Sequence, residues 1–356
     1  MKKFILSVLL ISMVLFCGCS NSIRKFDSDS NISAENMTLE EKVGQIFMVR
    51  CDSVTADEIA EKKPGGIIMF ASDFSDLTES QVISKISYLK SSVEITPFIA
   101  VDEEGGTVVR VSQNPNLVPR KYKSPQEYYN EGGIELIKNN AKEKSELLLK
   151  LGINMNLSPV ADISTNADDF IYDRSFGKGA EETADYVSEV VSVMNECNIA
   201  SCLKHFPGYG GNVDTHTSVA VDTRSLAYLE ENDFLPFQSG IAAGADSVLV
   251  SHNIINDIDS SQPATLSRAV HEILRNDLQF SGLIITDDMS MAAAADYSEP
   301  YKRAVLAGND MIIVTDFDTA YNEVLSAAEN GEISVEIIDT AVNRIISAKR
   351  HRGLLN

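Results

Sequence analysis

Short, continuous apolar runs recur along this chain. Each is rich in β-branched residues, which is typical of strands that are covered on both faces of a parallel sheet. The runs are Val43–Val49, Gly66–Phe70, Pro97–Val101, Ile153–Leu157, Ile199–Leu203, Ser247–Val250, Leu283–Ile285 and Met311–Val314. We therefore predict eight buried parallel strands.

Longer segments with helical spacing separate these runs, among them Gln126–Leu151, Ala180–Glu196, Leu226–Ala243 and Ser267–Asp277. Alternation of strand and helix through eight units predicts an α/β fold, a (β/α)8 TIM barrel. The alternative is an open doubly wound sheet, which usually carries a glycine fingerprint after its first strand. The sequence shows no such fingerprint, so we favour the barrel.

The first 19 residues have the pattern of an export signal. Lys2 and Lys3 precede the apolar stretch from Phe4 to Phe16, and Gly18 stands directly before Cys19. A small residue before a cysteine resembles a bacterial lipoprotein signal, so we expect Cys19 to be lipidated after cleavage. An ordinary cleaved signal peptide is the alternative.

The rest of the chain divides at Met37. Residues 20–36, rich in Ser, Asn and Asp, are expected to form a flexible tether, and residues 37–356 a single catalytic TIM-barrel domain. We expect an exported, cell-surface or membrane-anchored bacterial lipoprotein that touches the membrane through its N-terminal lipid only. We expect this protein to be a monomer.

The charge of the chain bears on its partners, and the spacing of its cysteines bears on metal sites and disulfides. The formal net charge of −22 argues against nucleic acid as a partner. Beyond the signal region, Cys51, Cys197 and Cys202 lack metal-ligand spacing and are expected to be mostly core thiols. A Cys197–Cys202 disulfide is not favoured because Cys202 falls within a predicted buried strand.

One loop combines charge, imidazole and turn residues. Lys204 and His205 stand at the end of the run Ile199–Leu203, and Pro207, Gly208 and Gly210 then break regular structure. Asp214 and His216 follow a few residues later. A loop of this composition on a rigid scaffold is a candidate active-site loop.

Other polar residues also follow predicted strands, where the catalytic groups of a barrel gather. They are Asp102 and Glu103 after the third strand, Asp162 after the fourth, His252 after the sixth, Asp287 and Asp288 after the seventh and Asp316 after the eighth. Such a rim suits hydrolysis of a neutral, hydroxyl-rich substrate such as a sugar. Breaking a glycosidic bond requires a carboxylate that faces the anomeric carbon of the sugar, and Asp287 is well placed for this role. Its alternative role is to cap the next helix.

The chain resembles glycoside hydrolase family 3, in particular its β-N-acetylglucosaminidase (β-hexosaminidase) branch. The segment around Gly282-Leu283-Ile284-Ile285-Thr286-Asp287 matches the family's nucleophile pattern, and the segment from Lys204 to Gly210 is similar to the branch's KHFPGHG motif. The resemblance implies that Asp287 is the nucleophile and that His216, partnered by Asp214, is the general acid and base.

The resemblance also implies binding residues for the sugar hydroxyls. These are Asp102, Arg110, Arg174, Lys204 and His205, with His252 as a possible wall of the pocket. The chain departs from the pattern at Thr107, where the family often has arginine, at Tyr209, which replaces a second histidine, and at Gly211, which replaces an aspartate.

We therefore expect a retaining, exo-acting β-N-acetylglucosaminidase that cleaves terminal residues from short sugars or cell-wall fragments, with no metal and no organic cofactor. The end of the sequence at Asn356, directly after the last predicted helix, favours the single-domain branch. Open alternatives are a β-glucosidase or phosphorylase of the same family, a Schiff-base lyase using Lys204, and a non-catalytic sugar-binding lipoprotein.

Overall fold

Eight parallel strands form one sheet in this computed structural model, which describes residues 32–212, 220–291, 294 and 297–355. The sheet order is β10-β1-β2-β3-β4-β5-β7-β9. The strands are β1 (Phe47–Arg50), β2 (Gly66–Met69), β3 (Phe98–Val101), β4 (Met155–Asn156), β5 (Ala200–Phe206), β7 (Ser247–Val250), β9 (Leu283–Thr286) and β10 (Ile312–Val314). A parallel bridge between Ile285 and Met311 joins β9 to β10, so the sheet closes into the predicted barrel.

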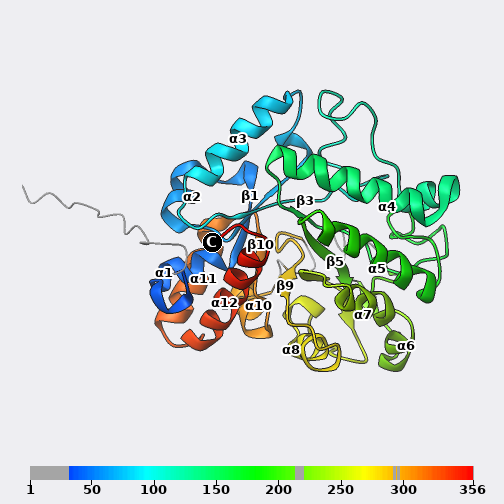
Figure 1. Cartoon of the computed structure of the whole chain (residues 1–356). Coiled ribbons are helices and arrows are strands. Elements are labelled where there is room, and N and C mark those ends of the chain that lie inside the picture. The colour runs from blue at the N-terminus through cyan, green and yellow to red at the C-terminus, as the bar shows by residue number, and fades with distance from the viewer. Residues whose placement is uncertain (1–31, 213–219, 292–293, 295–296, 356) are drawn as a thin grey trace, which may run out of the picture.

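Helices surround this barrel (Figure 1). In chain order they are α1 (Leu39–Gln45), α2 (Ala56–Lys62), α3 (Glu79–Ser91), α4 (Pro125–Leu151), α5 (Ala180–Glu196), α6 (Leu226–Glu231), α7 (Phe234–Ala242), α8 (Arg268–Glu272), α10 (Pro300–Ala307), α11 (Phe317–Glu329) and α12 (Val335–His351). Two short strands, β6 (Val221–Asp222) and β8 (Ile254–Ile255), form a separate parallel pair.

Two element predictions need correction, and a third is confirmed with a change of helix type. Val43 belongs to helix α1, because Thr38 and Glu41 form a capping box that starts a helix before the first strand. The single helix predicted over Leu226–Ala243 is two helices, α6 and α7. The segment predicted as a helix over Ser267–Asp277 continues α8 as a π-helical turn at Ile273–Asp277.

The barrel interior is filled by alternate strand residues. Met48, Ile68, Ala100, Cys202, Leu249 and Ile313 belong to one buried apolar cluster, and Ile345 of α12 packs into the same cluster. The intervening strand residues, such as Val49 and Val248, pack in the larger cluster formed with the surrounding helices. Both faces of the sheet are therefore apolar, which explains why the strands read as continuous apolar runs.

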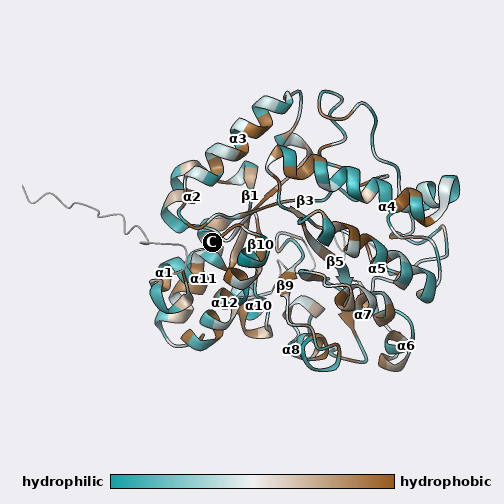
Figure 2. Cartoon of the chain, viewed as in Figure 1, coloured by the Kyte–Doolittle hydropathy of each residue, from teal (hydrophilic) through white to brown (hydrophobic). Residues whose placement is uncertain are grey.

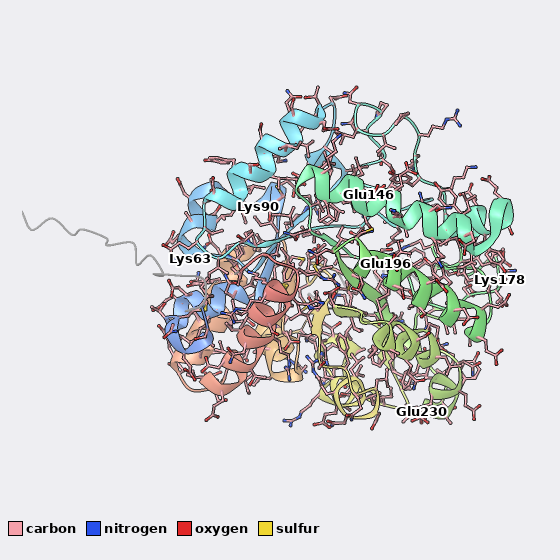
Figure 3. The ribbon with its side chains drawn as sticks, viewed as in Figure 1. Lys63, Lys90, Glu146, Lys178, Glu196 and Glu230 are labelled. Carbon is pink, nitrogen blue, oxygen red and sulfur yellow. The ribbon has the colours of Figure 1, made fainter. Side chains whose placement is uncertain are left out.

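Hydropathy follows this layering. Figure 2 shows apolar strands at the centre and polar outer faces on the helices. Charged side chains such as Lys178 and Glu230 lie at the outer edge in Figure 3.

The folded domain begins before Met37. Ile32 and Ala34, which the sequence analysis assigns to the tether, are buried, and the backbone N–H of Ala34 donates to Asn343 Oδ1 of α12 at 3.3 Å. Cys51, Cys197 and Cys202 are free thiols, so the disfavoured disulfide is not formed. Among the described residues, no helix has the length and apolar character needed to cross a membrane.

One lysine is buried at the inner side of α12. Lys349 Nζ donates to Gln45 Oε1 at 2.7 Å and lies 5.8 Å from the ring centroid of Phe98. Burial lowers the pKa of Lys349 to about 7, because an ammonium loses hydration inside the protein. Below that pH the native state must therefore hold a buried charge.

Lys349→Met is expected to flatten the pH dependence of stability. Between pH 7 and the ordinary lysine pKa, the unfolded wild-type chain binds a proton that the native chain has lost, so wild-type stability rises with pH. Relative to the variant, the wild type should gain up to about 1.4 kcal/mol of unfolding free energy per pH unit. Urea unfolding from pH 7 to pH 10 measures this slope, with the exposed Lys142→Met as control. Parallel curves for wild type and Lys349→Met would contradict the assignment.

Candidate active site

A cavity of about 630 Å³ lies at the carboxyl ends of the strands, where a barrel places its functional groups. Its floor is apolar and consists of Ile68, Leu157, Leu249 and Ile313, which point up from the barrel interior. Its wall is polar and includes Arg50, Asp102, Arg110, Asp173, Arg174, Lys204, His205, Asp287 and Asp288. The predicted substrate-binding residues and the predicted nucleophile therefore line one cavity.

Lys204 is the centre of a buried charge network. Its Nζ lies 2.6 Å from Asp102 Oδ1 and 2.6 Å from Glu104 Oε1, and its side chain is 2% exposed. Arg174 holds Glu104 with two bonds, from Nε to Oε2 at 3.0 Å and from Nη2 to Oε1 at 2.8 Å. Two cations and two carboxylates thus neutralise one another at the wall of the cavity.

The charges of this network fix its protonation states. Burial alone would raise the pKa of Glu104, but Arg174 and Lys204 outweigh burial and hold the pKa well below its usual range. Burial likewise opposes the ammonium form of Lys204, and Asp102 with Glu104 raises its pKa above the ordinary value. Lys204 is therefore a fixed cation and Glu104 a fixed anion at neutral pH.

His205 is held by a second carboxylate, Asp162. The Asp162 Oδ2 atom lies 2.7 Å from His205 Nδ1 and also accepts the His205 backbone N–H at 3.1 Å. Arg174 Nη2 lies 3.2 Å from His205 Nε2. Because a guanidinium can only donate, this contact assigns a lone pair to Nε2 and the ring proton to Nδ1.

The position of these two residues differs from prediction. Lys204 and His205 lie within strand β5, which runs to Phe206, and not beyond its end. Lys204 continues the inward series of Ala200 and Cys202. The pairing of β5 with β7 shifts between Lys204 and Phe206, and such irregularities re-aim side chains, so consecutive residues both line the cavity.

The loop after β3 contributes Asp102 to the cavity wall and Glu104 to the buried charge network of Lys204. Asp102 Oδ2 lies 3.6 Å from Arg110 Nη2 across the cavity wall. Gly105 adopts φ +108°, and a Cβ there would lie 2.2 Å from the Lys123 carbonyl oxygen, so the turn requires glycine. Glu103 points away from the cavity and accepts the backbone N–H groups of Arg110 and Val111 at 2.8 and 2.7 Å.

Asp287 directly follows β9 and lines the cavity. Its backbone N–H donates to the Val250 carbonyl at 3.1 Å, and its Oδ1 accepts the Asp288 backbone N–H at 2.8 Å. The carboxylate is therefore oriented by the strand end and by the following peptide. Asp288 Oδ1 accepts the Ser290 backbone N–H at 2.9 Å, so Asp288 takes the turn-capping role.

Sequence and structural comparisons assign the family. The profile described as Glycosyl hydrolase family 3 N terminal domain matches residues 38–348. This chain belongs to glycosyl hydrolase family 3. Membership makes it a glycoside hydrolase, and the family predicted from the Asp287 and Lys204 segments is confirmed.

Individual proteins of known name or structure are similar over most of this chain. A protein of Methylococcus capsulatus named beta-hexosaminidase is 30% identical over 78% of this chain and 84% of its own. The β-N-acetylglucosaminidase of Paenibacillus sp. superposes with a TM-score of 0.83 at 30% identity, over 89% of this chain and 63% of that solved chain. The β-N-acetylhexosaminidase of Beutenbergia cavernae gives 0.78 at 26%, over 88% of this chain and 99% of its own.

The remaining predicted site residues separate into three groups. Asp214 and His216 lie outside the described residues, as does Cys19. Asp316 does not line the cavity, because it caps α11 by accepting the Thr319 backbone N–H at 3.1 Å. His252 is fully buried behind the wall, and the prediction that it forms part of the pocket surface is wrong.

The buried position of His252 has a local cause. Its Nδ1 lies 2.7 Å from Thr265 Oγ1 and its Nε2 lies 3.0 Å from the Asp288 carbonyl oxygen. A carbonyl accepts only, so Nε2–H is the donor. His252 thereby supports the backbone beside Asp287 from behind.

Several cavity residues were missed as individual candidates. Arg50 and Asp173 line the cavity but were not predicted as site residues. Glu104 was also missed, and it belongs to the site through its ion pairs with Lys204 and Arg174. Arg50 ends strand β1, so the strand-end rule could have found it once that strand was placed correctly. Phe170, in the middle of an irregular loop, carried no such signal.

The departures from the family pattern occupy different places. Thr107 lines the cavity. Tyr209 is buried, and Asp162 Oδ1 accepts its backbone N–H at 2.7 Å. The α-carbon of Gly211 faces the Asp169 carboxylate, which a Cβ would approach to 3.2 Å.

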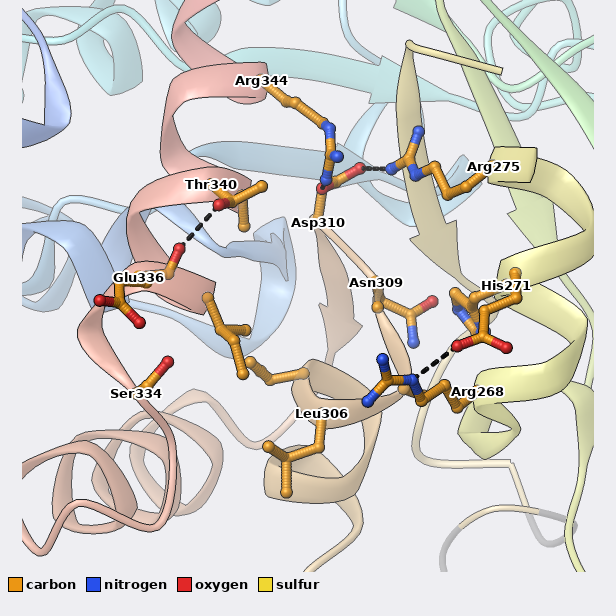
Figure 4. Close-up of a pocket in the computed structure, with 16 residues that line it drawn as sticks. Arg268, His271, Arg275, Leu306, Asn309, Asp310, Ser334, Glu336, Thr340 and Arg344 are labelled. Carbon is orange, nitrogen blue, oxygen red and sulfur yellow. Dashed lines mark hydrogen bonds and ion pairs between the residues drawn. The ribbon is translucent and has the colours of Figure 1, made fainter. Parts of the chain in front are cut away.

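A second cavity, of about 400 Å³, lies between α8, α10 and α12 (Figure 4). Asp310, in its wall, precedes β10, whereas Asp287 follows β9, so this cavity lies toward the opposite end of the barrel. Arg275 and Arg344 both bind Asp310, at 2.5 and 2.9 Å. These charges are engaged with one another, and the residues that line this cavity are all different from those that line the first cavity.

Lys204→Met is expected to destabilise the fold by about 3–5 kcal/mol at pH 7, because it leaves buried carboxylates short of a cation. The loss should shrink as the pH falls. Without Lys204, Glu104 takes up a proton at a higher pH than in the wild type, and a neutral carboxyl needs no cation. Urea unfolding at pH 7 and pH 4 measures both effects.

Lys150→Met serves as the matched control, since Lys150 pairs with Glu79 on the exposed surface and should contribute less than about 1 kcal/mol. A Lys204→Met loss as small as the control, or equal at both pH values, would show that the buried network does not stabilise the fold electrostatically.

Proposed function

We propose that this family 3 protein is a retaining, exo-acting β-N-acetylglucosaminidase acting on short sugars or cell-wall fragments. The observation that carries the proposal is the placement of Asp287 in one cavity with Asp102, Lys204 and Arg174. Relatives named beta-hexosaminidase and a similar β-N-acetylglucosaminidase structure support the substrate class. The apolar floor closes the cavity at one end, which suits a terminal sugar.

The cavity wall matches the chemistry of a sugar ring. Asp102 is an acceptor for hydroxyl protons, while Lys204, Arg110 and Arg174 donate to hydroxyl oxygens. Because the buried cations and carboxylates offset one another, a neutral substrate meets a wall without large excess charge. Family 3 chemistry then requires a carboxylate beneath the anomeric carbon, and Asp287 is the candidate.

The proposed reaction has two displacements. In the first, an Asp287 oxygen attacks the anomeric carbon, the glycosidic C–O bond breaks, and His216 gives its proton to the leaving oxygen. In the second, water attacks the same carbon, His216 takes the water proton, and the Asp287 ester bond breaks. Asp214 would orient His216 and stabilise its protonated form. The assignments of Asp214 and His216 rest on the motif alone.

The Schiff-base alternative is not supported by the geometry. A lysine nucleophile must be a neutral amine, usually reached by a depressed pKa. Lys204 lies between Asp102 and Glu104, which together raise its pKa. A lysine held as a cation suits hydroxyl binding better than carbonyl attack.

The decisive experiment compares p-nitrophenyl β-N-acetylglucosaminide with the β-glucoside, each with and without phosphate. We expect preference for the N-acetylglucosaminide. Asp287→Asn should lower kcat by about a thousandfold or more, since a carboxamide is a poor nucleophile. Asp316→Asn, which alters another strand-end carboxylate outside the cavity, is the matched control and should retain activity.

Each alternative has its own signature in this assay. Full activity of Asp287→Asn rules out the nucleophile assignment, and preference for the glucoside rules out the branch. A sugar phosphate as product identifies a phosphorylase. Binding without turnover in the wild type identifies a sugar-binding protein.

We also propose that Cys19 is lipidated and anchors the protein at the cell surface, on the strength of the signal pattern alone. In a bacterial host fed a labelled fatty acid, the wild type should carry label and sediment with membranes, because its acyl chains partition into the bilayer. Cys19→Ala should lose the label and Cys17→Ala should keep it. Label retained by Cys19→Ala would refute the assignment.

A further inference from the structure

An exposed aromatic ring stands on the wall of the active-site cavity. Phe170 lies on the loop between β4 and α5, lines the cavity together with Asp173 and Arg174, and is 39% exposed. Of the large apolar side chains that the described residues leave exposed, Phe170 is the one that lines this cavity. An exposed phenyl ring beside a polar sugar site is a candidate contact for an apolar ligand face.

The ring is supported from behind. Tyr209 is 2% exposed, and its ring centroid lies 5.6 Å from that of Phe170 and 5.7 Å from that of His205. Both spacings fall within the range of favourable aromatic pairs. Tyr209 thus connects His205, in the polar wall, with the exposed ring of Phe170.

The loop under Phe170 is anchored on both sides. Before it, Ser164 Oγ donates to Asp169 Oδ2 at 2.7 Å. After it, the buried Ile171 accepts the backbone N–H groups of Arg174 and Ser175 at 3.0 and 2.9 Å. A ring on an anchored backbone loses little conformational freedom when a ligand binds, so its contacts contribute more to affinity.

Phe70 is the other phenylalanine that lines the cavity, and arginine side chains lie over its ring. Arg50 lies 4.2 Å and Arg110 lies 5.4 Å from the ring centroid of Phe70. Guanidinium groups therefore already contact Phe70. The face of Phe170 is the better candidate for a ligand.

We propose that Phe170, backed by Tyr209, is a stacking platform for the pyranose ring of the leaving group. This inference rests on the proposed function. The charged wall at Asp102, Lys204 and Arg174 holds the sugar that is transferred, and the C–H face of the next sugar packs on Phe170. The family departure at Tyr209 then has a physical role, because a tyrosine ring fills the space behind Phe170.

Two substrates with the same transferred sugar test the platform. N,N′-Diacetylchitobiose carries a second pyranose ring as leaving group, and methyl β-N-acetylglucosaminide carries a methyl group. Phe170→Ala should lower kcat/KM for the disaccharide about tenfold, through a higher KM, and change the methyl glycoside less than about twofold. Phe170→Tyr should retain the wild-type ratio of the two substrates. Phe170→Leu, which keeps apolar bulk without a flat face, should resemble Phe170→Ala.

The controls separate the platform from general damage. Tyr88→Ala removes an aromatic ring that is 62% exposed on α3 and should leave both substrates unaffected. Thermal unfolding shows whether each variant is folded, and Phe170→Leu replaces Phe170→Ala if the alanine variant is not. An equal change for both substrates, or no change for either, overturns the platform. If the wild type hydrolyses neither substrate, the proposed function itself fails.

Discussion

The site depends on the ion pairs of the buried Lys204 ammonium. An unpaired charge inside the barrel would be prohibitively costly, so Lys204 requires Asp102 and Glu104 within 2.6 Å, and Glu104 in turn requires Arg174. This set of partners comes from three parts of the chain: the loop after β3, the loop before α5 and strand β5. The ion pairs that neutralise Lys204 therefore hold these three parts of the chain at a fixed distance from one another.

The layered barrel makes this arrangement possible. Ala200, Cys202 and Lys204 occupy successive inward positions of β5, so the same strand supplies apolar packing below and a charge above. The floor residues Leu249 and Ile313 come from β7 and β10 in the same way. Stability is concentrated in the barrel interior, while chemistry is concentrated in the uppermost layer, where strands give way to loops. Lys349 is a buried polar side chain on α12, and its amine donates a hydrogen bond to Gln45.

The carboxylates at the strand ends show how similar sequence signals lead to different roles. Asp102 and Asp287 line the cavity, Asp162 orients His205, Glu103 shapes the loop that follows it, and Asp316 caps a helix. All five follow apolar strands, so the strand-end pattern indicates the correct edge of the barrel. The pattern cannot separate the carboxylates that face the cavity from those that support the backbone, because that depends on which N–H groups lie within reach. The resemblance to family 3 made this separation for Asp102 and Asp287, and left the aromatic row at Tyr209 unexplained.

The sequence by itself determined the barrel, the edge that bears the site and the family. Apolar periodicity reports burial on both faces of a strand, and the segments around Asp287 and Lys204 are long enough to be specific. Only the tertiary structure decided that Lys204 and His205 both face the cavity, that His252 lies behind it, and that Phe170 stands on Tyr209. These outcomes depend on a register shift, on burial and on contacts between distant loops. Local sequence patterns do not encode such features, because each arises from residues that meet only when the barrel closes.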